Sequence, residues 1–254
     1  MTHSFLPWHP KTTFSYYSSK LILGLAGSAC KAELKRHTVK IHFYDNLENH
    51  VLKRNKPVIT VSNHLSTFDD PLLFGILPLK DIVDVNRMRI TPAAQELTFD
   101  INSYFFNSGR LIPIIRGNGI FQKGMDHCVN ELNEIEPTWI HLFPEGKINQ
   151  NVDKCIRWKW GIARLILEAK DKPEIIPYAH RGLEKLMPFG PDNNNLNYIP
   201  TYGGIIEMAI GKPIQYKHLL SKCKGSDDAD SRILLTTHLQ NEFEKFRQSV
   251  PWIS

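Results

Sequence analysis

Short apolar runs of strand length recur along this chain, and most of them end at a proline, a glycine or a cluster of polar residues. Longer segments with helical periodicity lie between them. Strands that alternate with helices are typical of α/β proteins. We therefore predict an α/β fold with a mainly parallel sheet flanked by helices. The predicted strands cover residues 41–44, 58–61, 111–116, 138–143, 174–179 and 205–214.

Three predicted helices accompany these strands. The clearest runs from Asp153 to Lys170, where apolar residues fall on one broad face. A second covers Phe121 to Asn133, and the last runs from Ser231, as its N-cap, to Gln248. The segment 188–204 is rich in Pro, Asn and Gly, and it predicts a loop.

The composition excludes several classes of protein. Of the 254 residues, 42% are hydrophobic, which excludes a disordered chain. The net charge of +5 is too small for a dedicated nucleic-acid-binding protein, so we predict no nucleic-acid partner. The four cysteines are widely spaced and form neither a metal-ligand motif nor a disulfide framework, so we predict no metal site.

The N-terminal segment combines a short apolar run with flanking aromatics and lysines. The run from Leu21 to Cys30 is about half the ~20 residues that a membrane-spanning helix needs. Such a segment suits the interface of one leaflet, and the alternative is a helix packed on the domain. The predicted membrane contacts are Leu21, Ile22, Leu23 and Leu25. The chain thus divides into a membrane-associating segment at 1–40, a main domain at 41–215, and a polar linker with a packed C-terminal helix at 216–254.

His64 and Asp69 follow the predicted strand 58–61, five residues apart. On a continuous helix, positions five apart diverge by roughly 140°, so the chain must bend for the two side chains to meet. Asp70 and Pro71 favour such a bend, because Asp caps a helix and Pro suits its first turn. A histidine held by a carboxylate is a general base with its orienter. The alternative is a loop histidine beside a helix-capping aspartate.

Two more polar clusters lie at predicted strand ends. Arg116 precedes a glycine-containing turn that opens a helix, which is typical of a phosphate site; the alternative is a surface ion pair. Glu145 and Gly146 follow another strand, where a carboxylate and a flexible backbone could meet a polyol; the alternative is a simple turn. In a parallel sheet, all three clusters would lie at one edge.

The residues at these positions resemble the ordered sequence blocks of the glycerolipid acyltransferase superfamily. The blocks are Asn63-His64-x4-Asp69, Arg116-Gly117, Phe143-Pro144-Glu145-Gly146 and an apolar strand with Pro177. Further blocks are similar to the members that exchange acyl chains between phospholipids and lysophospholipids. They lie at 86–89, 91–94, 122–126, 143–149 and 157–162, and the resemblance extends from about Val58 to Pro177.

The resemblance implies a CoA-independent transacylase that remodels cardiolipin in mitochondria and uses no cofactor. It implies a peripheral enzyme on the inner or outer membrane, facing the intermembrane space, with cardiolipin, monolysocardiolipin and phosphatidylcholine as substrates; an oligomer is compatible with the sequence. His64 and Asp69 become the catalytic dyad, and Arg116, Glu145 and Gly146 fall in substrate-binding blocks. Lys147, a further predicted substrate-binding residue, stands where many glycerol-phosphate acyltransferases have Thr.

The mechanism expected from this resemblance is direct transfer, in which His64 deprotonates a lysolipid hydroxyl that attacks an acyl ester of a donor phospholipid. The nearest alternative is an acyl-CoA-dependent lysophospholipid acyltransferase, and a non-catalytic lipid-binding protein is another. The apolar segment 72–79 behind the dyad is expected to dip into a leaflet, the alternative being a buried helix. Its predicted membrane contacts are Leu73, Phe74 and Leu77.

Overall fold

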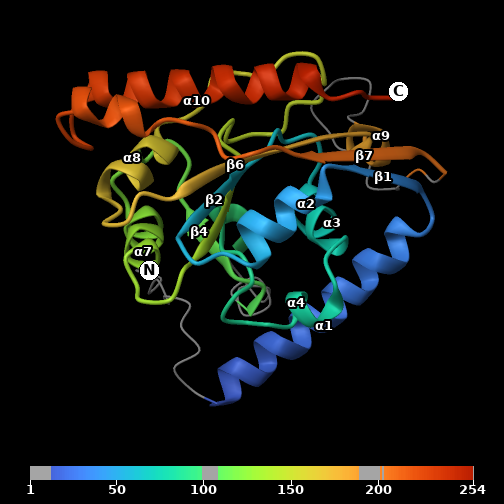
Figure 1. Ribbon diagram of the computed structural model, residues 1–254. Helices are drawn as coiled ribbons and strands as arrows, with labels where there is room; N and C mark the ends of the chain where they lie inside the picture. The colour runs from blue at the N-terminus through green and yellow to red at the C-terminus, as the bar shows by residue number, and fades with distance from the viewer. Residues whose placement is uncertain (1–12, 99–107, 189–200, 202, 254) are drawn as a thin grey trace.

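A five-stranded sheet forms the centre of the molecule, in a computed structural model that describes residues 13–98, 108–188, 201 and 203–253 (Figure 1). The strand order is β1-β7-β6-β2-β5, and every neighbouring pair is parallel except β6 and β7. The mainly parallel α/β sheet predicted from the sequence is therefore confirmed. The strands are β1 (Thr38–His42), β2 (Val58–Val61), β5 (Trp139–Leu142), β6 (Glu174–Arg181) and β7 (Ile205–Ile210).

A second, two-stranded sheet continues this arrangement beyond β5. It consists of β3 (Thr91–Ala94) and β4 (Leu111–Ile114), which are parallel. A parallel bridge between Ile90 and Ile140 connects it to β5. The carboxyl ends of β2, β5, β6, β3 and β4 consequently point toward the same edge of the molecule.

Helices lie on both sides of the sheet (Figure 1). On one side, α10 (Ala229–Ser249) packs along β6 and on α8 (Gly161–Glu168), which contacts α7 (Lys123–Leu132). On the other side, α1 (Thr13–Leu34) packs outside two shorter helices, α3 (Asp69–Gly75) and α4 (Leu79–Ile82). Smaller elements are α2 (Tyr44–Asn46), the π-helix Leu47–Leu52, α5 (Gln95–Thr98), α9 (Leu183–Leu186) and the 3-10 helix Lys217–Lys222.

The close contact of α1 with the main domain depends on small residues. A Cβ atom added at Gly27 would lie 2.8 Å from Ile82 Cγ2, and one added at Gly75 would lie 2.9 Å from Cys30 Cβ. Lys31 adds a hydrogen bond to the carbonyl of Gly75, at the end of α3. The helix is therefore seated on α3 and α4 by one face, and no helix that the structure describes has the length and hydropathy to cross a membrane.

The expectation that segment 72–79 touches lipid is wrong in this structure. Leu73, Phe74 and Leu77 are all buried, because α3 lies between α1 and the sheet. The ring of Phe74 makes edge-to-face contacts with Trp139, His141 and Tyr178. Leu23, expected to contact lipid from the N-terminal segment, is also buried against the domain.

Two of the predicted helices begin at a different residue for reasons that the structure shows. The helix expected over Asp153 to Lys170 begins only at Gly161, because side chains from elsewhere bind the preceding main-chain N–H groups: Ile156 donates to Glu145, and Trp158 donates to Gln240. The last helix begins at Ala229, and its N-cap is Asp228, which accepts a hydrogen bond from the expected cap, Ser231. The structure also contains β3, which was not predicted, whereas most of the predicted loop at 188–204 lies outside the described residues.

Candidate active site

The polar loop that follows β2 places His64 at the carboxyl edge of the sheet. Ser62 is still paired with β5 through a hydrogen bond from its N–H to the carbonyl of Leu142. The chain then turns, and α3 begins at Asp69. The bend required for His64 and Asp69 to meet is therefore present.

His64 and Asp69 form a hydrogen-bonded pair, with 2.9 Å between His64 Nδ1 and Asp69 Oδ2. The same carboxylate oxygen accepts the main-chain N–H groups of Leu65 and Ser66, at 2.5 and 2.9 Å. Asp69 is completely buried, whereas the side chain of His64 is 20% exposed. Because a carboxylate only accepts, Nδ1 donates in this pair, and in the neutral ring the lone pair then lies on Nε2.

Phe143 fixes the plane of the His64 ring. The two rings are stacked, with 4.3 Å between their centroids and 28° between their planes. This contact covers one face of the imidazole with an apolar surface. The ring therefore has little freedom to rotate away from Asp69.

A second histidine at this edge, His141, is unsuited to be the base. It is buried in β5, and its Nδ1 and Nε2 lie 2.8 and 3.1 Å from Thr60 Oγ1 and Ser62 Oγ. Burial holds the pKa of His141 well below its ordinary value. Both ring nitrogens are thus engaged inside the protein, and the accessible imidazole is that of His64.

Glu145 lies beside the dyad loop but is directed into the protein. Its carboxylate accepts hydrogen bonds from Asn149 Nδ2 at 2.9 Å and from the N–H of Ile156 at 3.0 Å. Burial raises the pKa of Glu145, although these hydrogen bonds and the main chain and charge of His64 act in the opposite direction. In this structure Glu145 therefore braces the segment 149–156 and does not present its carboxylate to a headgroup.

The segment after Glu145 is in turn bonded to the dyad loop. The N–H of Asn149 donates to the carbonyl of His64 at 2.7 Å, and Gln150 Nε2 donates to the carbonyl of Leu65 at 3.1 Å. Sequence analysis did not predict Asn149 or Gln150 as site residues. Asn149 belongs to the block 143–149, whereas Gln150 lies just beyond it, and only the fold shows what the two side chains hold.

Gly146 and Lys147 are exposed next to this brace. Gly146 has a φ of 70°, which favours glycine, and a Cβ there would lie 3.3 Å from Lys159 Cγ. Two lysines, Lys147 and Lys159, therefore lie at the rim beside the dyad loop. Both are exposed, as an anionic headgroup would require.

Arg116 lies farther from the dyad than the other predicted residues. It is exposed, two residues beyond the end of β4. From β2, the order β2-β5-β3-β4 puts β4 three strand positions away, which is about 14 Å at the usual spacing. Arg116 thus shares an edge of the sheet with His64 without touching it.

His180 was missed by sequence analysis, because it lies just beyond the predicted end of its strand. It is buried at the end of β6, and its Nε2 lies 3.7 Å from Asp69 Oδ2. Its side chain and main chain also bind Asn63, the residue before His64. The neighbourhood of the dyad therefore includes a contribution from β6.

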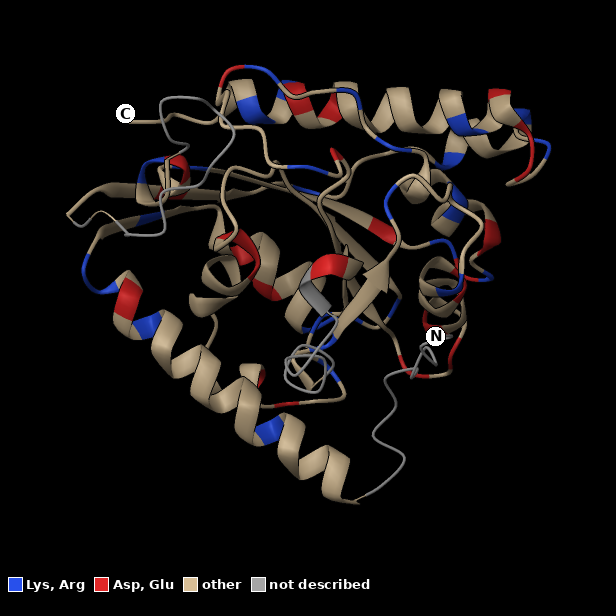
Figure 2. Cartoon of the chain, turned by 180° about the vertical axis from the view of Figure 1, so that it is seen from behind, with Lys and Arg blue, Asp and Glu red and all other residues tan. Residues whose placement is uncertain are grey.

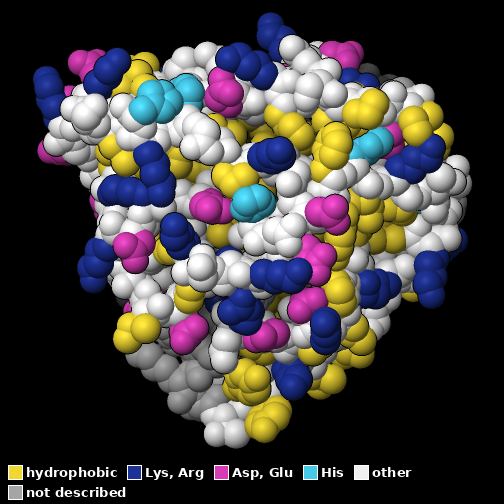
Figure 3. Space-filling model, viewed as in Figure 1, with side chains coloured by type: hydrophobic (Ala, Val, Ile, Leu, Met, Phe, Trp, Pro, Cys, Tyr) yellow, Lys and Arg dark blue, Asp and Glu magenta, His cyan; other side chains and the backbone are white. Residues whose placement is uncertain are grey.

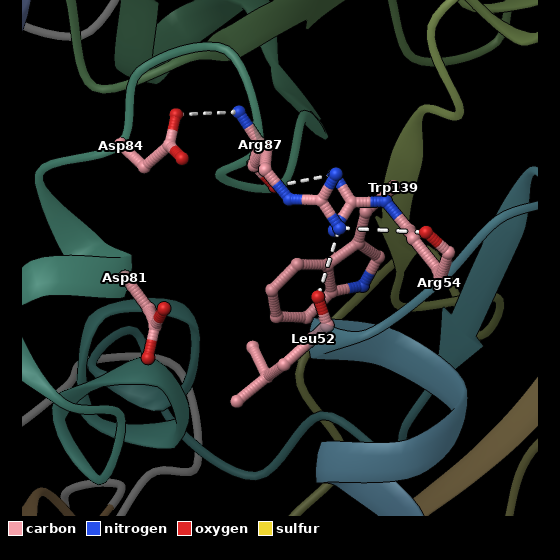
Figure 4. A pocket seen from close by; sticks show the side chains of 6 residues that line it. All are labelled: Leu52, Arg54, Asp81, Asp84, Arg87 and Trp139. Carbon is pink, nitrogen blue, oxygen red and sulfur yellow. Dashed lines mark hydrogen bonds between the residues drawn. The ribbon is translucent and has the colours of Figure 1, made fainter.

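A small cavity at the opposite edge of the sheet, near the start of β5, is not suited to a substrate (Figure 4). Its volume is about 20 Å³, room for roughly one water molecule. The guanidinium groups at its wall donate to main-chain carbonyls, and burial lowers the pKa of Arg54 to about 10. The cavity is lined by Leu52, Arg54, Asp81, Asp84, Arg87 and Trp139.

Within the described residues, no cluster of His, Cys, Asp or Glu could hold a metal ion.

Similar proteins place this arrangement in a family. The chain is 32% identical over 253 residues to a tafazzin of Dictyostelium discoideum, covering 90% of this chain and 86% of the relative. It is 32% identical to tafazzin of Drosophila melanogaster, and 37% identical over 180 residues to an N-acylphosphatidylethanolamine synthase of Arabidopsis thaliana. The matches cover 92% and 69% of this chain, but only 62% and 63% of these two relatives.

A solved structure supports the fold. The crystal structure of the 1-acyl-sn-glycerophosphate acyltransferase PlsC of Thermotoga maritima matches with a TM-score of 0.58 at 17% identity, covering 93% of this chain and 82% of that one. A family model described as Acyltransferase matches residues 38–181, more than half of the chain and the part that holds the dyad. The chain therefore belongs to the acyltransferase family and is a homologue of the tafazzins.

Proposed function

We propose that this protein is a CoA-independent transacylase that moves acyl chains between phospholipids and lysophospholipids, with monolysocardiolipin as an acceptor. The observation that carries the proposal is the His64–Asp69 pair, in which a buried carboxylate fixes the tautomer of an accessible imidazole. The similarity to tafazzins supports phospholipid substrates and a mitochondrial location. We further propose that the protein is peripheral on the inner or outer membrane and faces the intermembrane space. Phosphatidylcholine is the proposed donor and cardiolipin the remodelled product.

The chemistry needs one base and no covalent enzyme intermediate. His64 Nε2 takes the proton of the lysolipid hydroxyl while the oxygen attacks the ester carbonyl of the donor. When the tetrahedral intermediate collapses, the donor's glycerol oxygen leaves and takes the proton back from His64. One ester bond forms as another breaks, so the reaction is nearly thermoneutral. Asp69 stabilises the transient imidazolium.

The proposed substrate contacts lie along the carboxyl edge of the sheet. Lys147 at the rim and Arg116 farther along the edge are placed to bind lipid phosphates, one near the reacting ester and one about 14 Å away by strand spacing. Gly146 allows the glycerol backbone to approach closely. Glu145 acts by holding the loop around His64, through its hydrogen bonds with Asn149 and Ile156.

The proposed membrane-binding surface is the outer face of α1. Phe14, Tyr17, Leu21 and Leu25 recur at helical spacing on this face and are 62–77% exposed. Figure 2 shows that this helix carries few charged residues, and Figure 3 shows hydrophobic side chains along the lower edge of the molecule. Ile22, partly buried, borders this face. An apolar helix face of this kind is suited to lie in the headgroup region of one leaflet.

The decisive experiment is acyl transfer in the absence of CoA. Labelled phosphatidylcholine and monolysocardiolipin are incubated with the purified protein, and labelled cardiolipin is measured. We expect transfer by the wild type and a loss of at least about a hundredfold in His64→Ala. Transfer only after acyl-CoA is added would favour the CoA-dependent alternative, and unchanged activity of His64→Ala would exclude the dyad mechanism. A protein that binds liposomes without any transfer would be a lipid-binding module.

A second candidate activity follows from the plant relative, whose name denotes synthesis of N-acylphosphatidylethanolamine. The same base could serve an amine acceptor, by removing the proton that the nitrogen carries as it attacks the ester. Offering lysophosphatidylcholine and phosphatidylethanolamine together as acceptors separates the two activities. Under our proposal the O-acylated product predominates, whereas an excess of the N-acylated lipid would favour the second candidate.

A further inference from the structure

The backbone that carries His64 is held by a reciprocal pair formed by Asn63 and His180. The N–H of His180 donates to Asn63 Oδ1 at 3.1 Å, and Asn63 Nδ2 donates to the carbonyl of His180 at 3.0 Å. In return, His180 Nε2 donates to the carbonyl of Asn63 at 2.8 Å. Each side chain thus satisfies the main chain of the other. Because both residues are buried, water does not compete for these hydrogen bonds.

The Asn63–His180 pair joins β2 to β6 beyond the last residues of their main-chain hydrogen-bond ladder. The parallel pairing of β2 with β6 stops at Val61 and Pro177, and Pro177 has no N–H to donate. The side-chain amide of Asn63 then takes the place of a peptide group opposite His180. Asn63 is therefore the last anchored residue before His64, and its position fixes where the imidazole can lie.

His180 also lies next to the other member of the dyad. Its Nε2 is 3.7 Å from Asp69 Oδ2, the oxygen that accepts the hydrogen bond from His64. This distance is too long for a hydrogen bond, but the His180 ring still lies beside a completely buried carboxylate, where charges interact more strongly than in water. Among the residues that the structure describes, His180 Nδ1 has no hydrogen-bond partner, and the hydrogen bond that orients the ring is the one from Nε2–H to Asn63.

We propose that His180 is a positioning residue for acyl transfer. It anchors Asn63, and through it the main chain of His64, and its ring packs beside the carboxylate of Asp69. It is completely buried and does not touch the substrate. The inference rests on the proposed function, in which His64 is the base. It adds a residue from β6, more than a hundred positions along the chain, to the unit that makes His64 effective.

The test compares two substitutions at His180. In His180→Gln the side-chain amide can reach as far as Nε2 and keep the hydrogen bond to Asn63, whereas His180→Leu fills similar space without a donor. In the CoA-free assay we expect His180→Leu to lower kcat by about 10- to 100-fold with KM changed less than about threefold. His180→Gln should retain kcat to within about threefold. If His180 only stabilised the fold, the Gln and Leu variants that fold would have similar kcat values as well as similar KM values.

Tyr178→Phe is the matched control, since it removes one buried hydrogen bond from the same strand, to the carbonyl of Leu73, two residues from His180. We expect it to lower the melting temperature without changing kcat. If His64→Ala is inactive but folded His180→Leu keeps the wild-type kcat, the positioning role is overturned while the proposed function stands. An equal loss in the Gln and Leu variants also overturns it. If His64→Ala remains active, the proposed function itself fails.

A measurement on the unmodified protein covers the case in which His180→Leu does not fold. In protein labelled with 15N-histidine, the ring of His180 should carry a proton on Nε2, because Nε2 faces the carbonyl of Asn63. The opposite tautomer, with the proton on Nδ1, would remove the bond on which the proposal depends and would overturn it.

Discussion

At the scale of single residues, the proposed mechanism depends on the charge of Asp69 to make His64 a base. Three N–H groups converge on Asp69 Oδ2, so the amide oxygen of Asp69→Asn can still accept them and keep the local geometry. What it loses is the negative charge opposite the imidazolium. We expect kcat to fall by about a hundredfold to ten-thousandfold with little change in the circular-dichroism spectrum.

The neighbouring Asp70 provides the control for this prediction. Its carboxylate is paired with Arg89 and accepts a hydrogen bond from Thr91 at 2.7 Å, outside the dyad. Asp70→Asn should therefore lower the melting temperature more than Asp69→Asn does and affect kcat much less. Equal kinetic losses in the two variants would contradict the role assigned to Asp69.

Glu145 leads to a prediction about pH and stability. Burial raises the pKa of Glu145 above its ordinary value of 4.5, so the folded protein binds this proton more tightly than the unfolded chain does. Its contribution to stability is complete below about pH 4.5 and is lost as the pH rises through the raised pKa. Glu145→Gln has no such proton. The free energy of unfolding of the wild type, minus that of the variant, should therefore fall as the pH rises toward neutrality.

Urea unfolding of the wild type and of Glu145→Gln at a series of pH values measures this difference in the free energy of unfolding. Groups that titrate alike in both proteins do not contribute to it. A difference that stays constant, or that grows with pH, would show that the carboxyl of Glu145 is not raised in pKa by burial. If Glu145 braces the loop, Glu145→Gln should change the free energy of unfolding more than it changes the affinity for substrate.

At the scale of elements, α1 has two faces with different partners. Its inner face packs on α3 and α4, and its outer face carries the exposed residues from Phe14 to Leu25. Leu21→Asp puts a charge on the outer face only. We expect it to weaken binding to cardiolipin-containing liposomes by about tenfold or more, since it removes roughly 1.5–3 kcal/mol of apolar burial, with an unchanged melting temperature.

Ile135→Asp is a matched control, because Ile135 is 97% exposed and lies outside α1. It should leave liposome binding unchanged in a flotation assay. Leu73→Asp should instead prevent folding, since Leu73 is buried in α3. Wild-type flotation of Leu21→Asp would rule out the outer face of α1 as the membrane surface.

The strands were predictable because their signals are local. Val58–Val61 is observed as predicted, and the other predicted strands are displaced by only a few residues. The dyad could be predicted for the same reason, since the whole motif lies within a few positions. Burial was harder, because the apolar segment 72–79 has the same composition whether its partner is lipid or the core. Contacts between residues distant in the chain, such as the hydrogen bonds between Asn63 and His180, could not be predicted either.

At the scale of the whole molecule, the C-terminal helix is connected to the dyad through hydrogen bonds. On α10, Gln240 accepts from the N–H of Trp158 and Glu244 accepts from the N–H of Cys155. These bonds hold the extended segment that lies between Glu145 and α8. Through Glu145 and Asn149, that segment is bonded in turn to the loop of His64.

This connection predicts that releasing the segment from α10 impairs catalysis at a distance. In the double variant Gln240→Ala/Glu244→Ala, two buried N–H groups lose their acceptors, which should lower the stability by about 2–4 kcal/mol and kcat by about tenfold as the loop loosens. The exposed pair Glu242 and Lys245 lies on the same helix, so Glu242→Ala/Lys245→Ala is the control and should change neither quantity. Urea unfolding and the CoA-free transfer assay measure the two effects. A loss of stability with kcat unchanged would mean that α10 supports the fold without reaching the dyad, whereas a parallel loss would make the C-terminal helix part of the unit that positions His64.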